Sequence, residues 1–460
     1  MRKLLTGGTV VTGQASIKAD ILIEDEKILA IGSTTELAQK FPEKAETIDV
    51  AGCLLFPGFI DAHTHFDLQV AGTVTADDFA SGTKAALCGG TTTILDFATQ
   101  YKGETLHQGI SNWQAKARGC SSCDYGFHLA ICDWNPAVEQ ELQAIVAEGV
   151  TSFKLYMTYD TKVNDREIFQ ILRRLKELGG IAGVHCENDG MIAALQQEEV
   201  AAGRMSVASH PKTRPEPAEA EAVNRLLRIA QIVDTPVIIV HLTCEESLKA
   251  IREARARGQK VYVETCPHYL LLDDSVYELP FAEAAKYVCA PPLRKQKDQE
   301  ALWQALAQEE IQTMSTDHCS FTTEQKALGK DDFRKVPGGM PGVENRGVLI
   351  YTYGVAGQKI TAQQMCRLLS ENPAKLYGLY PQKGALEPGS DADIVVLRPG
   401  VKETLTAAQQ TQKVDYTPYE GREVCAQIAK VFLRGTEAAV DGKVVRKNLG
   451  RYCPRKKFAL

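Results

Sequence analysis

The sequence predicts an α/β fold, namely a (β/α)₈ barrel with a small β-sandwich domain built from both chain ends. The first observation is that eight short apolar strands alternate with helical segments over about 265 residues, the pattern of a closed parallel barrel. The second is that short strands separated by turns occupy both ends of the chain. Segment 389–397 resembles segment 19–23, since both read Ala-Asp-Ile followed by apolar residues, so we expect the two ends to share one domain.

The first part of the chain, residues 1–52, is predicted to be a small β unit. Strands are expected at 9–11, 19–24 and 27–31, with glycine-rich or polar breaks between them. Only segment 35–41 has a helical period. This unit therefore supplies strands and little helix.

From Cys53 onward, buried strands alternate with helices. The strands are predicted at 55–63, 91–97, 125–131, 152–157, 181–186, 237–242, 261–265 and 312–316. The clearest helix is 165–178, where apolar residues recur at helical spacing before Gly179-Gly180 ends it. Two further helices with the same apolar spacing are predicted at 218–232 and 247–257. The alternative is a doubly wound open sheet, but no Gly-x-Gly-x-x-Gly motif opens a βα turn.

Short strands return after a helical stretch at 361–377, and they are predicted at 391–397, 429–433 and 437–445. We therefore divide the chain into 1–52 (β-sandwich, first part), 53–378 (barrel), 379–445 (β-sandwich, second part) and a basic tail, 446–460. The tail carries six Lys or Arg residues and no acid. We expect a solvated or subunit-docking arm there rather than a nucleic-acid arm.

Composition and charge exclude several classes of protein. Of the 460 residues, 44% are hydrophobic and 24% charged, as in an ordinary globular protein, and the net charge of −6 disfavours a nucleic-acid partner. No apolar run approaches the roughly 18 residues of a membrane helix, and the N-terminus lacks a signal-peptide core. The thirteen cysteines, an odd number scattered along the chain, suit reduced thiols. We therefore expect a cytoplasmic protein with no membrane partner.

Polar side chains gather at the carboxyl ends of five predicted strands. They are His63 and His65 after strand one, Lys154 in strand four, His185 ending strand five, His241 ending strand six and Asp317 after strand eight. The two histidines of His-x-His share one face of a strand, because side chains alternate with period two. Catalytic groups of such barrels lie at this end. The pattern predicts one polar, metal-binding site.

Each of these residues also has a structural interpretation. A single strand-end histidine often makes only a structural hydrogen bond, a strand lysine can extend to water, and Asp317 could cap a helix. Such placements are independent of one another. Their coincidence at the same ends of five strands favours the shared site.

The order of these residues resembles that of the binuclear amidohydrolases, and the local motifs resemble the dihydropyrimidinase and D-hydantoinase branch. The motifs begin at Gly58 (Gly-Phe-Ile-Asp-Ala-His-Thr-His-Phe), Lys154 (Lys-Leu-Tyr-Met-Thr-Tyr), Cys266 (Cys-Pro-His-Tyr-Leu), Pro291 (Pro-Pro-Leu-Arg) and Thr316 (Thr-Asp-His-Cys). The similarity runs through nearly the whole chain. His-x-His alone is weak evidence, whereas the full set is specific.

The resemblance implies two divalent metal ions per chain, usually zinc, and a lysine carboxylated by CO₂ to N6-carboxylysine. By resemblance, His63, His65 and Asp317 hold one metal ion. His185 and His241 hold the other, and the Lys154 carbamate bridges the two. Carbamylation suits this role, because an ammonium would repel two cations that lie roughly 3.5–4 Å apart.

The resemblance also implies hydrolysis of a cyclic amide in a small-molecule ureide by a metal-bridging hydroxide, with Asp317 moving the proton. Tyr159 is the implied donor to the oxyanion, and main-chain groups of Ala290 and Gly338 hold the ring. The family usually has Ser and Asn at the last two positions, which leaves ring preference open. The substrates implied are 5-monosubstituted hydantoins and dihydropyrimidines, hydrolysed to N-carbamoyl amino acids.

Related activities and a scaffold role are the alternatives. Dihydroorotase is disfavoured, because an arginine usually follows its His-x-His where this chain has Asp67. Allantoinase is weakened by the motif from Lys154 to Tyr159. A non-enzymatic scaffold would have lost metal ligands, and every ligand is present here. The resemblance further implies a homotetramer.

Overall fold

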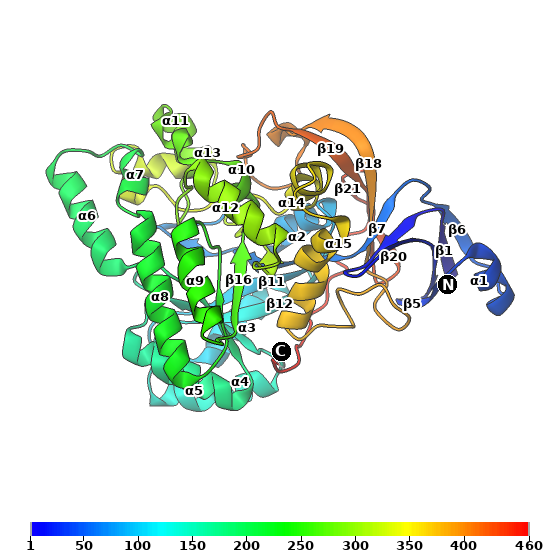
Figure 1. Ribbon diagram of the computed structural model, residues 1–460, viewed down its shortest axis with the longest axis horizontal. Coiled ribbons are helices and arrows are strands. Elements are labelled where there is room, and N and C mark those ends of the chain that lie inside the picture. Colours follow the sequence, from blue (N-terminus) through cyan, green and yellow to red (C-terminus); the bar gives the residue numbers. More distant parts are fainter. Residues whose placement is uncertain (1, 459–460) are drawn as a thin grey trace.

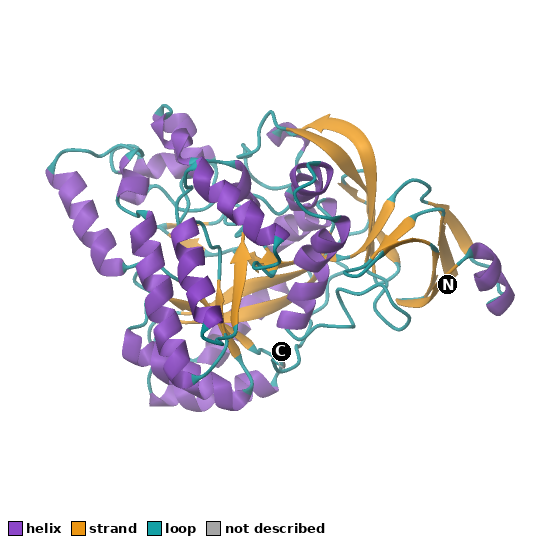
Figure 2. Ribbon diagram, in the orientation of Figure 1, coloured by secondary structure: helices purple, strands orange, loops and turns teal. Residues whose placement is uncertain are grey.

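A computed structural model describes residues 2–458 and has two parts that lie side by side (Figure 1). A parallel sheet surrounded by helices forms the larger part, and a smaller part consisting mostly of strands lies next to it (Figure 2). The N-terminus belongs to the smaller part. The predicted barrel with a β domain beside it is confirmed.

The sheet of the larger part has eight parallel strands in the order β17-β16-β15-β14-β13-β12-β11-β8. Nearly all of their residues are buried, as expected for strands covered on both faces. Their bounds are β8 (Phe59–Thr64), β11 (Thr91–Gln100), β12 (Asp124–Ile131), β13 (Ser152–Tyr156), β14 (Ile181–His185), β15 (Val237–Ile239), β16 (Val261–Thr265) and β17 (Thr313–Met314).

The barrel closes between its first and last strands. A parallel bridge joins Thr64 to His318, just beyond β17. The buried guanidinium of Arg346 donates from Nη1 to the carbonyl oxygens of Ile60 in β8 and Met314 in β17, both at 2.8 Å. Arg346 therefore joins the two strands that meet at the seam.

Helices cover the outside of the barrel and link its strands. The longer ones are α2 (Phe79–Cys88), α3 (Leu106–Ala117), α4 (Pro136–Ala147), α5 (Asp165–Leu178), α6 (Asp189–Ala201), α8 (Glu216–Val233), α9 (Glu245–Ala256) and α12 (Gln296–Ala307). Shorter ones are α7 (Ser209–Lys212), α10 (Pro267–Leu271), α11 (Phe281–Ala284), α13 (Thr323–Lys326), α14 (Arg346–Ile350), α15 (Ala362–Cys366) and α16 (Asn372–Leu376). Helix α1 (Thr34–Lys40) belongs instead to the β domain (Figure 1). The predicted helix 165–178 is α5, with a capping box at Asn164 and left-handed Gly179 at its end.

The β domain consists of two sheets. One has the order β5-β4-β1-β6 and the other β21-β20-β19-β18-β7-β2-β3. Their strands are β1 (Arg2–Thr6), β2 (Thr9–Val11), β3 (Ser16–Lys18), β4 (Asp20–Glu24), β5 (Lys27–Gly32), β6 (Glu46–Asp49), β7 (Leu54–Pro57), β18 (Ile394–Thr404), β19 (Glu423–Leu433), β20 (Thr436–Val440) and β21 (Lys443–Val444). Apolar residues from both chain ends, such as Ile21, Leu55 and Ile394, form one buried cluster between the sheets.

The predicted single strand 55–63 is wrong, because the chain changes sheets at Gly58. β7 pairs with β18 and β2 of the β domain, whereas β8 pairs with β11 of the barrel. A Cβ atom on Gly58 would lie 2.0 Å from Oγ1 of Thr92, so only glycine fits this crossing. An uninterrupted apolar run concealed the break. The domain limits at 52 and 378 stay a prediction.

Two barrel strands are shorter than predicted, since β15 ends at Ile239 and β17 ends at Met314. His241 and Asp317, which follow them, have φ angles of 39° and 50°. These left-handed conformations end the ladder and turn the chain at the barrel rim. The predicted strands 237–242 and 312–316 therefore run too far.

Buried ion pairs join the two domains. Nζ of Lys383 lies 2.5 Å from Asp124 at the start of β12 and 2.7 Å from Asp393 of the β domain. Arg434 also pairs with Asp124. Because each charge is paired, burial of the cluster fixes the relative placement of the domains without leaving an isolated ion.

The described residues 446–458 of the tail pack along their own barrel and so do not form a free arm, although Arg446, Lys447, Arg451, Lys456 and Lys457 are exposed to solvent. Subunit docking stays a prediction. The backbone pairs at Tyr125 with Arg451 and Cys453, and Arg455 N donates to Gly149 O at 2.9 Å. The buried Arg455 guanidinium donates to Phe127 O and Ser152 Oγ. These partners lie at the amino ends of the strands, so the tail covers the end of the barrel opposite the strand C-termini.

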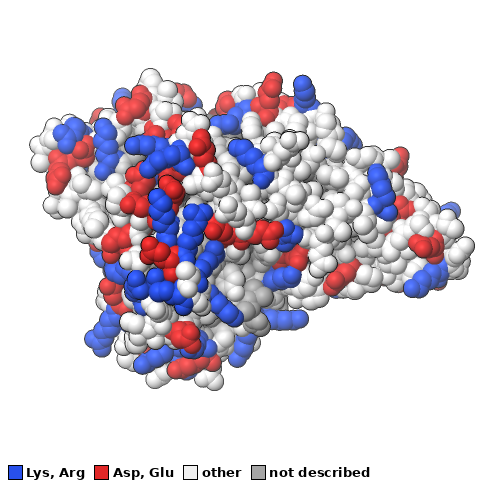
Figure 3. All heavy atoms as spheres, in the orientation of Figure 1, with Lys and Arg blue, Asp and Glu red and all other residues white. Residues whose placement is uncertain are grey.

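Among residues 2–458, no helix is both long and apolar enough to cross a membrane. All thirteen cysteines are free thiols. The face drawn in Figure 3 carries Lys and Arg interspersed with Asp and Glu rather than one continuous basic surface.

Candidate metal centre

The His-x-His pair and the acid after the last strand meet at one point. His63 belongs to β8 and His65 follows it, and their ring centroids lie 5.2 Å apart. Nε2 of each ring lies 3.1 Å from Oδ1 of Asp317. The backbone N–H of His65 donates to His318 O at 2.8 Å, which fixes the first and last strands in this register.

A second pair of histidines faces the first. His185 ends β14 and His241 follows β15; Nδ1 of His185 lies 2.9 Å from Nε2 of His241. Both side chains are buried. One ligand atom each of His63, His241 and Asp317 lies within 4.8 Å of the other two, so the two histidine pairs face one common space.

Lys154 of β13 lies between these groups and is 1% exposed. Its Nζ atom lies 3.5 Å from Nε2 of His63 and 4.8 Å from the ring centre of Phe97. Burial lowers the pKa of Lys154 to about 8, partly offset by Asp317 and Glu264. Within the described chain it forms no ion pair, so it is a buried amine without a counter-ion.

Two carboxylates orient the histidine rings from behind. Glu264 Oε1 lies 2.6 Å from Nδ1 of His63, and Glu187 Oε2 lies 2.7 Å from Nε2 of His185. A carboxylate accepts, so those nitrogens carry the protons and the opposite nitrogens present lone pairs to the centre. Arg214 pairs with Glu187 at 2.5 Å, and it holds the pKa of Glu187 at about 2 although burial alone would raise it.

The directions of the imidazole lone pairs indicate whether these residues fit metal ions. Lone pairs of His63 and His185 face Asp317 and His241, respectively, at hydrogen-bond distances. Two lone pairs that face one another repel unless a proton or a cation lies between them. Imidazole nitrogen and carboxylate oxygen are zinc ligands, so the donor set fits divalent cations.

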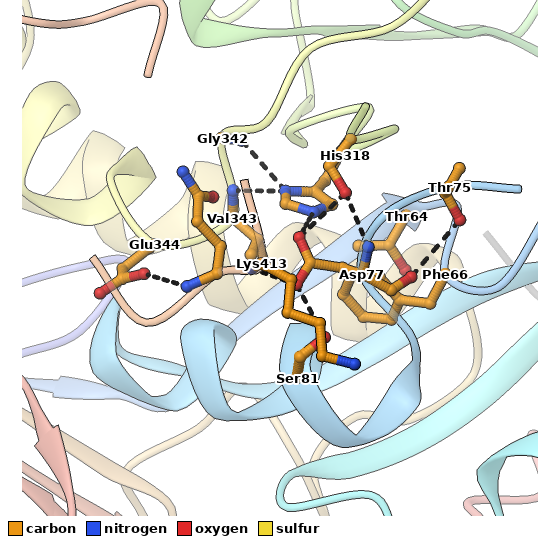
Figure 4. Close-up of polar contacts among 12 residues, drawn as sticks. Thr64, Phe66, Thr75, Asp77, Ser81, His318, Gly342, Val343, Glu344 and Lys413 are labelled. Atoms are coloured by element: carbon orange, nitrogen blue, oxygen red, sulfur yellow. Dashed lines mark hydrogen bonds and ion pairs between the residues drawn. The ribbon is translucent and has the colours of Figure 1, made fainter. Parts of the chain in front are cut away.

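His318, which follows Asp317 in the chain, is held by a network of polar contacts (Figure 4). Nδ1 of His318 accepts from the backbone N–H groups of Gly342 and Val343 at 3.0 and 3.2 Å, and Nε2 donates to Asp77 at 3.1 Å. Asp77 also accepts from Ser81 and from the Lys413 N–H, both at 2.8 Å. A fully bonded ring thus supports the left-handed turn at Asp317.

All nine predicted site residues line one cavity of about 710 Å³ at the carboxyl ends of the strands. They are His63, His65, Lys154, Tyr159, His185, Ala290, Gly338, His241 and Asp317. Tyr159, Asp317 and His241 have φ angles of 70°, 50° and 39°. Strained backbone of this kind clusters at functional sites.

Several residues of the site escaped the sequence analysis. Glu264, Glu187 and Arg214 orient ligands or neighbouring rings, and Asp77 and His318 support Asp317. Glu187 lies two positions after His185, just beyond the end of a predicted strand, so its position was a usable signal. Asp77 had no such signal, because its partner lies 241 positions away.

The barrel and its polar rim define a metal-dependent hydrolase of the (β/α)₈ class. The model of the amidohydrolase family matches residues 54–444. The chain belongs to the amidohydrolase family, in its D-hydantoinase and dihydropyrimidinase branch.

Three relatives illustrate this placement. A D-hydantoinase of Geobacillus stearothermophilus is 41% identical over 100% of this chain and 97% of its own length. A D-phenylhydantoinase of Escherichia coli (strain K12) is 40% identical over 100% and 99%. The crystal structure of dihydropyrimidinase from Brevibacillus agri NCHU1002 superimposes with a TM-score of 0.97 at 42% identity, covering 100% of both chains.

Proposed function

We propose that this chain hydrolyses the ring amide bond of 5-monosubstituted hydantoins and dihydropyrimidines to give N-carbamoyl amino acids. The named relatives support the substrate class. The observation that carries the chemistry is the convergence of four histidines and Asp317 around the buried amine of Lys154.

We infer a pair of divalent ions, with zinc as the ion. His63, His65 and Asp317 would hold one ion, and His185 and His241 would hold the other. Lys154, as N6-carboxylysine, would contact both. When bound, the ions supply Lewis acidity, which ionises water near neutral pH and polarises a carbonyl. Carbamylation replaces a cation with an anion, so Lys154 and Asp317 together offset part of the positive charge, and the remainder favours an oxyanion.

Asp317 is the proposed proton carrier. His63 and His65 hold its pKa well below the usual range, although burial alone would raise it. The ionised carboxylate can take the proton of the attacking water at Oδ1 and pass it to the leaving ring nitrogen. One group thus acts as general base and then as general acid.

Tyr159 is the proposed donor to the oxyanion. Its ring centroid lies 5.1 Å from that of His185, and the Arg214 guanidinium lies 5.3 Å from the ring centre. Arg214 is itself fixed by Glu187. The stacked guanidinium therefore restricts the ring, which places the hydroxyl group before substrate binds.

The backbone of Ala290 and Gly338 is proposed to hold the ring. Both residues line the same cavity as Lys154. A Cβ atom at Gly338 would meet nothing within 4 Å, so a larger residue would fit at this position without a steric clash. A main-chain contact there would be the same with the Asn of relatives, which supports a role independent of the side chain.

The experiment is a hydrolysis panel on the metal-loaded protein: dihydrouracil, hydantoin, both enantiomers of a 5-substituted hydantoin, allantoin and dihydroorotate. We expect turnover of dihydrouracil or the hydantoins and release of the N-carbamoyl acid. Turnover of allantoin alone would replace the proposal with allantoinase activity. No turnover at full metal occupancy would favour the scaffold role. Light scattering would test the proposed homotetramer.

A further inference from the structure

Lys326, the last residue of α13, is a buried lysine outside the metal centre. It is 1% exposed, and its Nζ atom donates to the carbonyl oxygens of Val288, Pro337 and Gly339 at 2.9, 2.7 and 2.7 Å. An ammonium has three N–H donors and no acceptor. Each donor of Lys326 therefore has one carbonyl partner.

The three carbonyls belong to the segments proposed to hold the substrate. Val288 precedes Ala290 by two positions, and Pro337 and Gly339 lie on either side of Gly338. Ala290 and Gly338 line the cavity, whereas Lys326 is behind its wall. The ammonium thus joins the two segments from the side opposite the substrate.

The lysine is held firmly at its base. Thr322 and Gln325 form a capping box at the start of α13. The Gln325 amide also donates to Thr73 Oγ1 at 2.8 Å and to Val74 O at 2.6 Å. Because α13 is anchored on the hairpin β9 (Gln69–Val70)–β10 (Thr73–Val74), the position of Nζ is set independently of the segments it binds.

The surroundings of Lys326 contain no carboxylate partner within the described chain. The facing groups are the thiols of Cys289 and Cys319, the His210 imidazole and the Phe321 ring, whose centre lies 5.6 Å away. Burial lowers the pKa of Lys326 to about 7. A buried charge without a counter-ion adds little net stability, so the arrangement indicates a need for three convergent donors.

We propose that Lys326 is a positioning residue that sets the spacing of the two main-chain segments at Ala290 and Gly338, and so governs binding of the cyclic ureide ring. It does not touch the substrate. The inference rests on the proposed function, because a ring must occupy the cavity for the spacing to matter. Loss of the donors would let the segments move apart and weaken ground-state and transition-state binding alike.

The test compares Lys326→Met with Lys330→Met, a matched change at an exposed lysine four residues further on. Steady-state kinetics on dihydrouracil with metal-loaded protein should give a KM about tenfold higher for Lys326→Met, with kcat within about threefold of wild type and unchanged metal content. Lys330→Met should match wild type. An unchanged KM in Lys326→Met would overturn the inference.

Lys326→Gln keeps the test decisive if the methionine variant does not fold. Its amide offers two donors to three carbonyls, so its KM should lie between those of wild type and Lys326→Met. A merely structural role would lower Tm and the fraction of active protein, which reduces apparent kcat but leaves KM unchanged. A wild-type KM in Lys326→Gln would contradict the proposal.

The pH profile gives a second readout. The neutral amine has only two donors, so the wild-type KM should rise as pH increases through about 7. The glutamine variant should lack this rise, and a rise of equal size in both proteins would overturn the inference. If the wild type hydrolyses no cyclic ureide, the proposed function fails and the inference falls with it. An active wild type with unchanged KM in both variants overturns the inference alone.

Discussion

Nζ of Lys154 lies 3.5 Å from Nε2 of His63, inside the barrel and out of contact with water. A protonated lysine there would face four imidazoles without an ion-pair partner. Burial lowers its pKa to about 8, so part of the population is the neutral amine, the form that can add CO₂. The placement is costly for an ammonium and suits an anionic bridge between two cations.

Lys154→Ala should lose both metal ions and reduce turnover by at least about a thousandfold, because the bridging ligand is gone. Metal content by elemental analysis and turnover of dihydrouracil measure the two effects. Short carboxylic acids such as acetate, added in excess, should restore part of the metal content. Lys330→Ala is the control; two ions per chain in Lys154→Ala would contradict the bridge.

Asp317→Asn should fold and reduce kcat by about 10²–10⁴, since an amide cannot carry the proton between water and the leaving nitrogen. The amide oxygen can still face His63 and His65, so the midpoint of thermal unfolding should change little. Turnover is measured at full metal occupancy. An unchanged kcat would remove Asp317 from proton transfer.

Glu264→Ala should weaken metal binding by about 10–100-fold, because Nδ1 of His63 loses the acceptor that orients its ring. Glu264→Gln should lose less, since an amide oxygen still accepts that N–H. Competition with a chelator measures the affinity of each variant. Equal affinity in the alanine variant and wild type would show that Glu264 does not orient His63.

Asp77 should make the fold sensitive to acid. Hydrogen bonds from His318, Lys413 N–H and Ser81 lower its pKa from 3.8 to about 2, although burial alone would raise it. This stabilisation is present above pH 3.8 and is lost as pH falls through about 2; it amounts to about 2 kcal/mol. The midpoint of thermal unfolding of metal-free protein, measured between about pH 5 and pH 2, should fall less steeply with decreasing pH in Asp77→Asn than in wild type. Parallel declines would contradict the assignment.

Much of the fold and the ligand set could be predicted because their signals are local. Helix α5 has a clear apolar period and both of its caps, and the ligands follow buried strands at the end where these barrels place catalytic groups. The break between β7 and β8 at Gly58 could not be predicted, because it depends on contact with Thr92 across the sheet.

The supporting residues could not be predicted for the same reason. Glu264 lies 201 positions from His63, and the carbonyl partners of Lys326 come from two separate segments. The docking of Arg455 beneath the barrel likewise depends on Phe127 and Ser152, which are distant in sequence. Tertiary structure alone brings these groups together.

The most direct test of the central claim is a crystal structure of the metal-loaded enzyme. We expect density that continues from Nζ of Lys154 into a carbamate that contacts two ions, one beside His63, His65 and Asp317 and the other beside His185 and His241. An unmodified lysine in fully metal-loaded protein, with Nζ directed away from the four imidazoles, would contradict it.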